Sequence, residues 1–326
     1  MRVITIEDHF STPMDRAAIP PAGGVRKQTM EDLDDRMGLS VDEGLLDLGP
    51  MRLAAMDAAG IDFQVISLTA PGAQGCDPAD AVALARDAND RLHDAVKRHP
   101  QRFGAFAALP TAYPGDAAKE LERCVQRCGF KGALINGHTR GEYLDDAKFW
   151  GIFECAEALG VPVYLHPTLP HPLVMKAYFE GALEPFSRAP WGFAIEAGTH
   201  FLRLVMAGIF DRFPKLTLIL GHLGEGIPFV LERMNSHSKR VCAHAGLKKD
   251  IRQYFRDHVV VTTSGNFSIP AFLCTLMTLG ADNIIFSVDW PYEKNEWGAK
   301  FLRELPISPE DLDKVAHRNA ERVLKL

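Results

Sequence analysis

The chain has 326 residues, of which 47% are hydrophobic and 24% are charged, a composition typical of a globular protein with a large buried core. The formal net charge is −6 and no basic run is present, so we do not expect nucleic acid or membranes as partners. The N-terminus lacks the apolar stretch of a signal peptide, and no segment has the roughly 20 apolar residues of a membrane span. We therefore expect a soluble cytoplasmic protein.

Short apolar runs alternate with longer segments of helical periodicity along the whole chain. We predict strands in eight of these runs, at 2–9, 62–69, 102–110, 132–136, 161–167, 216–222, 258–265 and 283–291. Strands that alternate with helices form a parallel sheet, and eight such repeats fit a closed (β/α)8 barrel, the TIM barrel. The runs are almost continuously apolar, as expected for strands that are buried on both faces.

The segments between these runs have apolar residues at spacings of three and four, which predicts helices. The clearest examples are 78–100, 114–129, 147–160 and 197–214. Several helical segments end in a glycine just before the next strand, at Gly60, Gly129, Gly160 and Gly280. Glycine favours the left-handed conformation that stops a helix, so we expect turns between helix and strand at these positions.

One long interruption, 13–50, separates the first strand from its helix and has few large apolar residues. We interpret it as an excursion after the first strand that lies over the barrel mouth or against a neighbouring subunit. No flexible linker, low-complexity segment or short repeat divides the rest of the chain. The sequence therefore predicts a single domain over residues 1–326.

Six cysteines are scattered along the chain without a CxxC pair. Cys124 and Cys128 are four residues apart in a predicted helix, which places both thiols on one face. A disulfide or a structural zinc site is the less favoured alternative, and we expect reduced thiols.

Several ionisable residues fall at the C-terminal ends of the predicted strands, where TIM barrels carry their active sites. They are Glu7, His9, His166, His222 and Asp289. Side chains alternate along a strand, so Glu7 and His9 share one face. We expect Asp8 to point the other way, toward the helices.

A single histidine at a strand end is most often a buried group with an ordinary hydrogen bond. Four nitrogen and oxygen groups at one barrel mouth would be costly to bury unpaired, and a divalent cation would satisfy them. We therefore predict a metal site formed by Glu7, His9, His166 and Asp289. Two nitrogens and two oxygens suit Zn²⁺, Mn²⁺, Fe²⁺ or Co²⁺. The strand at 132–136 carries no lysine at its C-terminal end that could bridge a second ion, so we expect one.

His222 and Glu225 are three residues apart in the motif GHLGEG, at the expected start of a helix. This spacing lets the carboxylate accept from one imidazole nitrogen and leaves the other free for acid–base chemistry. The alternative is that Glu225 only stabilises the N-terminus of the helix. By their positions after strands, Thr69, Asn266 and Trp290 should line the pocket, although the indole could equally pack beneath a loop.

The motifs Glu7-x-His9, YLHP, LILGHLGEGIPF, VTTSGNF and FSVDWPYE, in this order, resemble the amidohydrolase-2 group of the amidohydrolase superfamily. Within it the chain is similar to the non-oxidative aromatic acid decarboxylases, which include the γ-resorcylate, 2,3-dihydroxybenzoate, salicylate and 5-carboxyvanillate enzymes and are related to aminocarboxymuconate semialdehyde decarboxylase. The Glu-x-His pair matches the γ-resorcylate type, whereas INGHTRGEYLDD resembles the 5-carboxyvanillate enzyme. Which hydroxybenzoate is the substrate therefore stays open.

The resemblance implies one divalent ion, Mn²⁺ or Zn²⁺, on the four residues named above. It also implies that His222 and Glu225 belong to the active site and that Arg233 helps to hold the carboxylate of a small aromatic acid. It further implies a carboxy-lyase of aromatic compound catabolism, as a homodimer or homotetramer.

The expected reaction is the metal-dependent decarboxylation of an ortho-hydroxybenzoate such as 2,6-dihydroxybenzoate to CO2 and a phenol. A proton must reach the carbon that bears the carboxyl group, and Asp289 is the first candidate donor, with His222 second. The alternative is a hydrolase of the same fold with one metal ion, in which His222 or Asp289 is the base. A metal-bearing binding protein without turnover is the third reading.

Overall fold

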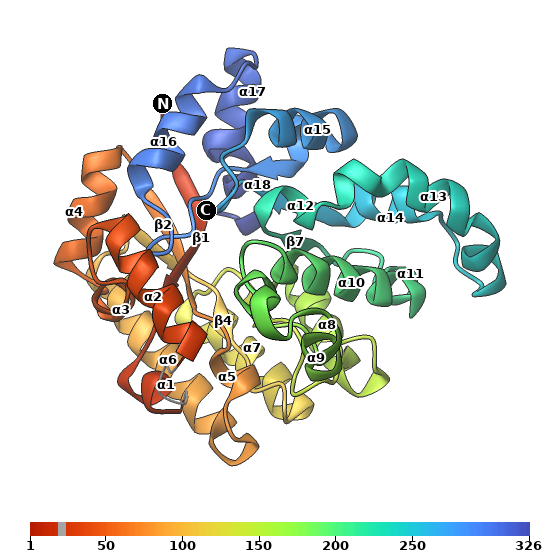
Figure 1. Cartoon of the computed structure of the whole chain (residues 1–326), viewed down its shortest axis with the longest axis horizontal. Helices are drawn as coiled ribbons and strands as arrows, with labels where there is room; N and C mark the ends of the chain where they lie inside the picture. The colour runs from red at the N-terminus through yellow and green to blue at the C-terminus, as the bar shows by residue number, and fades with distance from the viewer. Residues whose placement is uncertain (19–23) are drawn as a thin grey trace.

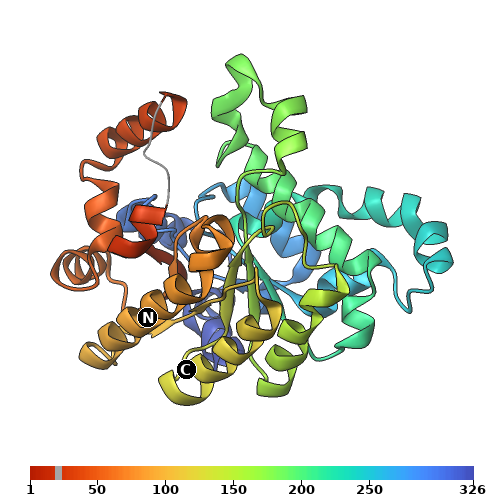
Figure 2. The same cartoon turned by 90° about the horizontal axis from the view of Figure 1, so that it is seen from below.

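A computed structural model of the chain describes residues 1–18 and 24–326. In these residues short parallel strands lie at the centre and helices surround them (Figures 1 and 2). The strands are β1 (Ile4–Phe10), β2 (Phe63–Leu68), β3 (Phe103–Ala105), β4 (Ala107–Ala108), β5 (Ala133–Asn136), β6 (Val163–His166), β7 (Leu218–Leu220), β8 (Val259–Thr262) and β9 (Ile284–Ile285). They form two parallel series, β1 to β3 and β4 to β9.

Backbone hydrogen bonds close these two series into a barrel. At one junction, β3 and β4 are halves of a single predicted strand, and Phe106 between them donates its N–H to the oxygen of Ile66 over 3.0 Å. At the other junction, the N–H of His9 donates to the backbone oxygen of Trp290 over 2.7 Å. The N–H of Asp289 donates to the backbone oxygen of Glu7 over 2.8 Å. The described residues therefore form the predicted eight-stranded (β/α)8 barrel, which is confirmed.

Large apolar side chains fill the inside of the barrel, as in other parallel barrels. They form one cluster of buried residues from successive strands: Ile4, Ile6, Phe63, Val65, Phe106, Leu134, Tyr164, Ile219, Val260 and Ile285. A second and larger cluster, which includes Ile66, Leu165 and Val261, lies between the strands and the helices. Burial on both faces explains why the strand segments are almost continuously apolar.

Glycine ends several of the outer helices, as predicted. Helix α7 (Pro114–Cys128) is followed by Gly129 with φ 72°, and α8 (Trp150–Leu159) by Gly160 with φ 63°. Both values lie in the left-handed region that side chains disfavour. The chain then turns directly into β5 and β6.

The helix predicted at 197–214 is two helices. Helix α10 (Gly192–Met206) ends before Gly208, and α11 (Ile209–Arg212) begins after it. Gly208 has φ 75°, which breaks the right-handed path, and the periodicity of the apolar residues did not reveal this break. The other longer helices are α4 (Pro50–Ala59), α6 (Pro78–Arg98), α9 (Pro172–Tyr178), α13 (Ile227–His244), α14 (Ile251–His258), α15 (Ile269–Leu279), α16 (Asn295–Glu304) and α18 (Asn319–Leu324).

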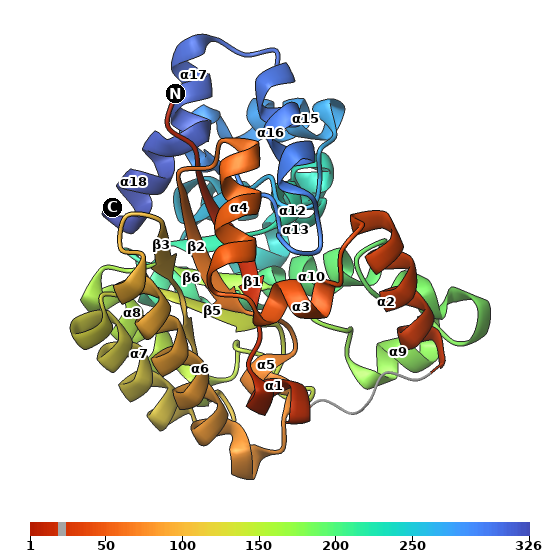
Figure 3. The same ribbon diagram turned by 90° about the vertical axis from the view of Figure 1, so that its left-hand side faces the viewer.

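The excursion predicted at 13–50 contains helices in its described part, and its residues 19–23 lie outside the described residues. These helices are α1 (Pro13–Ala18), α2 (Gly24–Met37) and α3 (Val41–Leu46). Ser11 donates its N–H to the oxygen of Leu45 over 2.8 Å, and Arg36 donates to the oxygen of Tyr292 over 2.9 Å. The excursion thus covers the C-terminal end of β1 and the loop after β9, and α2 contacts the 3₁₀ helix η2, Gly181–Ser187 (Figure 3).

All six cysteines lie in the described part of the chain and are free, in agreement with the expected reduced thiols. Burial and the Glu120 carboxylate hold the pKa of the Cys124 thiol above its usual range. Among the described residues, no helix is both long enough and apolar enough to cross a bilayer.

Candidate functional site

The first strand contains a β-bulge immediately before its charged residues. Thr5 pairs with Gln64, whereas the next paired residue of β1 is Asp8, opposite Ile66. Strand β1 therefore has one residue more than β2 in this interval, and the alternation of its side chains is interrupted once. Bulges beside active sites commonly re-aim a side chain in this way.

The bulge allows both Ile6 and Glu7 to point into the barrel. Ile6 belongs to the apolar interior, and Glu7 and His9 point to the mouth above it. The Ser287 hydroxyl accepts the N–H groups of Ile6 and Glu7 over 3.0 and 2.7 Å, so the bulge has buried hydrogen-bond partners. The common face predicted for Glu7 and His9 is present, but an uninterrupted strand starting from Ile6 would have turned Asp8 inward instead.

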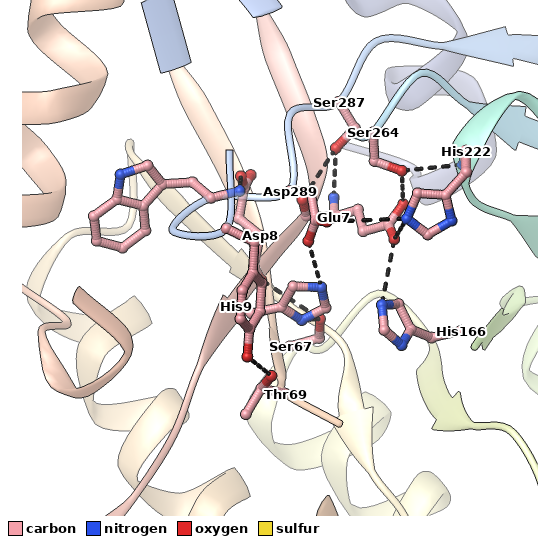
Figure 4. A network of polar contacts seen from close by, with 12 residues as sticks. Glu7, Asp8, His9, Ser67, Thr69, His166, His222, Ser264, Ser287 and Asp289 are labelled. Atoms are coloured by element: carbon pink, nitrogen blue, oxygen red, sulfur yellow. Dashed lines mark hydrogen bonds and ion pairs between the residues drawn. The ribbon is translucent and has the colours of Figure 1, made fainter. Parts of the chain in front are cut away.

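Four described side chains converge at the barrel mouth. Glu7, His9, His166 and Asp289 each offer one nitrogen or oxygen atom, and these atoms lie within 4.8 Å of one another. His9 Nε2 is 3.1 Å from Asp289 Oδ1, and His166 Nε2 is 3.5 Å from Glu7 Oε1 (Figure 4). These residues come from β1, from the end of β6 and from the loop after β9, so only the closed barrel brings them together.

The donor atoms of this cluster fit a divalent cation. Glu7 Oε1, His9 Nε2 and Asp289 Oδ1 are buried, and apart from their close approaches within the cluster they have no hydrogen-bond partner in the described residues. Burial, followed by the neighbouring His9, holds the pKa of His166 well below its usual range, so its imidazole is neutral. A neutral imidazole has the lone pair that a metal ligand needs. Two nitrogens and two carboxylates in a buried cluster are a ligand set for Zn²⁺ or Mn²⁺.

His222 and Glu225 lie in a left-handed turn directly after β7. The φ angles of His222, Leu223, Gly224, Glu225 and Gly226 are 51°, 60°, 83°, 55° and 73°. Right-handed helix begins only at Ile227, so the expected helical turn between the two residues is wrong. Left-handed backbone costs roughly 1–2 kcal/mol for each residue with a side chain, and surrounding contacts must hold it.

This turn brings the two side chains together and aims His222 at the cluster. His222 Nδ1 is 2.7 Å from Glu225 Oε1, as the sequence predicted. Its Nε2 is 3.6 Å from Glu7 Oε1 and 3.9 Å from Asp289 Oδ2. Burial lowers the pKa of His222, but the carboxylates of Glu225 and Glu7 outweigh it and hold the pKa well above its usual range. Burial raises the pKa of Asp289, but the imidazoles of His222 and His9 hold it below its usual range.

Asp8 has a structural environment outside the cluster. Its side chain is fully buried, accepts the Trp290 N–H over 3.1 Å and is hydrogen-bonded to the Thr5 hydroxyl. Burial raises its pKa to about 6, although the Thr5 hydroxyl and the Arg52 guanidinium oppose this. Asp8 therefore ties β1 to the loop that carries Asp289, and it is not exposed to solvent.

Trp290 does not line the pocket, and that prediction is wrong. Its side chain is 1% exposed, and the Arg52 guanidinium stacks on the indole with 4.2 Å between carbon Cζ and the ring centroid. Arg52 also donates to the oxygen of His9 over 2.6 Å. The alternative reading, an indole packed beneath a loop, describes what is found.

Two of the other predicted pocket residues lie beside the cluster. The Thr69 hydroxyl is 2.6 Å from the Tyr292 hydroxyl, and the ring of Tyr292 makes an edge contact with His9 at 5.8 Å between centroids. Asn266 is half-buried and donates to the oxygen of His222 over 3.5 Å. One residue therefore stands between each of these side chains and the predicted metal site, namely Tyr292 for Thr69 and His222 for Asn266.

Arg233 is the remaining residue that was predicted to bind the substrate. It is exposed on α13, more than a helical turn beyond the residue at which that helix begins, and α13 projects outward from the barrel (Figure 1). Its predicted contact with a substrate carboxylate stays a prediction.

Three buried residues that support the site were missed in the sequence. Tyr164 stands two positions before His166 on β6, a spacing that places both on the inward face and could have identified it. Ser287 stands two positions before Asp289 and had the same signal. Arg52 lies in helix α4, and no local pattern in the sequence shows that it is buried against Trp290.

Comparisons with known proteins agree with these motifs. Residues 19–326 match the family model described as Amidohydrolase. The gamma-resorcylate decarboxylase of Polaromonas sp. is 37% identical over 334 residues, which cover 99% of this chain and 98% of that protein. The crystal structure of a 2,6-dihydroxybenzoate decarboxylase complexed with 2,6-dihydroxybenzoate has a TM-score of 0.88 at 35% identity, with both chains covered completely. A dihydroxybenzoic acid decarboxylase from Polaromonas sp. with bound manganese and 2-nitroresorcinol has a TM-score of 0.86 at 36% identity, covering 100% of this chain and 97% of that one.

Proposed function

We propose that this chain, which belongs to the amidohydrolase family, is a metal-dependent decarboxylase that converts an ortho-hydroxybenzoate to CO2 and a phenol. The observation that carries the proposal is the convergence of two histidines and two carboxylates beside the pair of His222 and Glu225. The full-length similarity to gamma-resorcylate decarboxylases supports 2,6-dihydroxybenzoate as the first substrate to test.

Glu7, His9, His166 and Asp289 would hold one divalent ion, Mn²⁺ or Zn²⁺. The bound ion would supply positive charge that stabilises the carboxylate and the ionised ortho oxygen of the substrate. The manganese in the related Polaromonas structure supports this metal as the first to load.

The chemical difficulty of the reaction decides what the residues must do. Direct loss of CO2 would leave an electron pair in the plane of the ring, where nothing delocalises it. If the carbon that bears the carboxyl group accepts a proton first, the bond to that carboxyl group can break and its electron pair returns to the ring. A proton donor over the ring face is therefore required.

Asp289 is the proposed donor, with His222 as the second candidate. His222 Nε2 is 3.9 Å from Asp289 Oδ2, and the carboxylates around His222 keep it protonated. Glu225 fixes the imidazole through Nδ1, so that the Nε2 proton faces the site. In this arrangement the Nε2 proton of His222 would pass to Asp289 Oδ2, and Asp289 would then deliver that proton to the ring carbon.

Thr69 and Asn266 are proposed to contact the substrate, because Thr69 is hydrogen-bonded to Tyr292, whose ring contacts His9, and Asn266 is hydrogen-bonded to His222. Arg233 is proposed to help hold the substrate carboxylate, as the resemblance to the aromatic acid decarboxylases implies. We also propose the cytoplasm as location and a homodimer or homotetramer as the assembly, which light scattering on the purified protein would test.

The test is to remove bound metal, load the protein with Mn²⁺ or Zn²⁺, and incubate it with 2,6-dihydroxybenzoate. We expect equal amounts of CO2 and resorcinol, and no turnover by the metal-free protein. A panel with 2,3-dihydroxybenzoate, salicylate and 5-carboxyvanillate then ranks the substrates by kcat/KM. No CO2 from any member of the panel would refute decarboxylation and favour a hydrolase of the same fold.

A further inference from the structure

One oxygen of Glu7 lies against several buried hydroxyl groups of the described residues. Thr262 donates to Glu7 Oε2 over 2.8 Å, and the hydroxyls of Tyr164 and Ser264 make hydrogen bonds to the same atom. All four side chains have 0% exposure. Figure 4 shows Ser264 directly beside Glu7. We refer to Tyr164, Thr262 and Ser264 as the hydroxyl cradle.

The hydroxyl cradle is a connected network. The Tyr164 hydroxyl is 2.9 Å from that of Thr262, which is 2.8 Å from that of Ser264. Tyr164 lies on β6 two residues before His166, and Thr262 ends β8 two residues before Ser264. Strands on both sides of β7 therefore aim hydroxyls at the carboxylate that β1 brings into the barrel.

The other oxygen of Glu7 has a different environment. Within the described residues Glu7 Oε1 has no hydrogen-bond partner, and it lies 3.5 Å from His166 Nε2 and 3.6 Å from His222 Nε2. One oxygen of this carboxylate is thus satisfied by hydroxyl groups, whereas the other faces the imidazoles of the site.

Gly221 packs directly against Glu7 and the Tyr164 hydroxyl. A Cβ atom at this position would lie 3.0 Å from each carboxylate oxygen of Glu7 and 3.2 Å from the Tyr164 hydroxyl. These distances are shorter than ordinary contacts, so any side chain here would displace the carboxylate or the phenol. The first glycine of GHLGEG is therefore explained by the space that Glu7 and Tyr164 require.

We infer that Tyr164, Thr262 and Ser264 are positioning residues that hold the Glu7 carboxylate turned so that Oε1, and not Oε2, faces the site of the metal ion. Rotation of the carboxylate would break the three hydrogen bonds to Oε2, so the cradle favours this one orientation. A carboxylate that bound the ion through one oxygen would leave positions at the ion for oxygens of the substrate. The inference rests on the metal ligands named in the proposed function.

The experiment compares metal binding by variants that remove one hydroxyl with little change of shape. Tyr164→Phe and Thr262→Val each delete a cradle hydroxyl, and Thr262→Ser restores one. Tyr254→Phe is the matched control, because Tyr254 is 1% exposed and its hydroxyl accepts backbone N–H groups at Lys248 and Lys249, away from the cluster. Mn²⁺ and Co²⁺ affinities are measured by chelator competition, and the visible spectrum of the Co²⁺ protein reports its coordination.

We expect Tyr164→Phe and Thr262→Val to bind Mn²⁺ at least about tenfold more weakly. Loss of a residue that hydrogen-bonds a metal ligand typically lowers metal affinity roughly 10- to 100-fold. Their Co²⁺ spectra should change, whereas Thr262→Ser and Tyr254→Phe should match the parent protein in both measurements. Parent-like affinity and an unchanged spectrum in both deletion variants would overturn the inference. Equal weakening in Tyr254→Phe would also overturn it, because the effect would then come from loss of any buried hydroxyl.

These outcomes are separate from those of the proposed reaction. If the parent protein binds metal but releases no CO2, decarboxylation is refuted while the affinity comparison still decides the role of the cradle. If the parent decarboxylates and the deletion variants bind metal as tightly as the parent, the proposed function stands and the cradle inference fails.

Discussion

His222 Nδ1 and Glu225 Oε1 are 2.7 Å apart because the five residues 222–226 follow a left-handed path. In a right-handed helix the same spacing would also bring the side chains together, but the side chain of His222 would leave the backbone in a different direction. The left-handed turn aims His222 Nε2 toward Glu7 and Asp289 while Glu225 holds Nδ1.

The first prediction concerns this pair. His222→Ala should retain the metal and lose turnover by about 100-fold or more, since a positioned acid–base group contributes roughly 10²–10⁴-fold. Glu225→Gln should retain the metal and show a smaller loss, because the amide can still accept a hydrogen bond but lacks the charge. Metal content and steady-state rates check both. A His222→Ala protein with near-normal kcat would show that the imidazole has no part in proton transfer.

The second prediction concerns the metal. His9→Ala and His166→Ala should each lose the ion, because removal of one nitrogen leaves only three of the four described donors. Elemental analysis of the parent protein should give about one equivalent, and the exposed His244 on α13 provides a matched control, His244→Ala. Two equivalents in the parent, or full metal content in both variants, would contradict the proposed site.

The third prediction concerns Arg52. Its guanidinium is fully buried between Trp290 and the backbone of His9 and faces the buried Asp8. Arg52→Met should lower the free energy of unfolding at pH 7.5 by about 3 kcal/mol, because it leaves a buried carboxylate without its cation. The loss should shrink at pH 5, where Asp8, with a pKa of about 6, is protonated.

Urea unfolding of Arg52→Met at both pH values measures this effect, and the exposed Arg98 on α6 supplies the control Arg98→Met. An Arg52→Met protein as stable as the control at pH 7.5 would show that Arg52 does not stabilise the fold through Asp8.

The fourth prediction concerns the pH dependence of stability. Burial, followed by the charges of His138 and Arg203, lowers the pKa of His200 to about 3 from the usual 6.5. Below pH 6.5 the unfolded chain therefore binds a proton at His200 that the folded chain does not bind. The stabilisation of the fold by neutral His200 is complete above pH 6.5 and is lost as the pH falls toward 3. Lowering the pH from 7 to 5 should reduce the free energy of unfolding by about 2 kcal/mol, because each pKa unit corresponds to roughly 1.4 kcal/mol.

His200→Gln should remove most of this slope, because glutamine does not titrate and its oxygen can accept the Leu144 N–H that His200 Nε2 accepts over 3.0 Å. Unfolding free energies at several pH values measure the slope. The exposed His237 on α13 gives the control His237→Gln, which should keep the slope of the parent. An unchanged slope in His200→Gln would mean that other groups cause the acid sensitivity.

The barrel and its metal-site candidates were largely predictable because they depend on local patterns. Apolar runs separated by helical periodicity predicted the eight strands, and glycines such as Gly129 and Gly160 marked the turns between helix and strand. Once the barrel is assumed, residues at the C-terminal ends of the strands must meet at one mouth. This geometry explains why Glu7, His166 and Asp289, which are far apart in the sequence, were correctly expected to converge.

The sequence by itself determined the alternation of strands and helices and the residues at the strand ends, because hydrophobic periodicity and strand polarity are properties of short segments. Only the tertiary structure decided that a bulge held by Ser287 turns Glu7 inward, that the turn at His222 is left-handed and that Trp290 packs on Arg52. Each of these features depends on partners distant in the chain, whose contacts offset the local backbone and burial costs. Those contacts exist only after the barrel has closed, so no pattern within a short segment could reveal them.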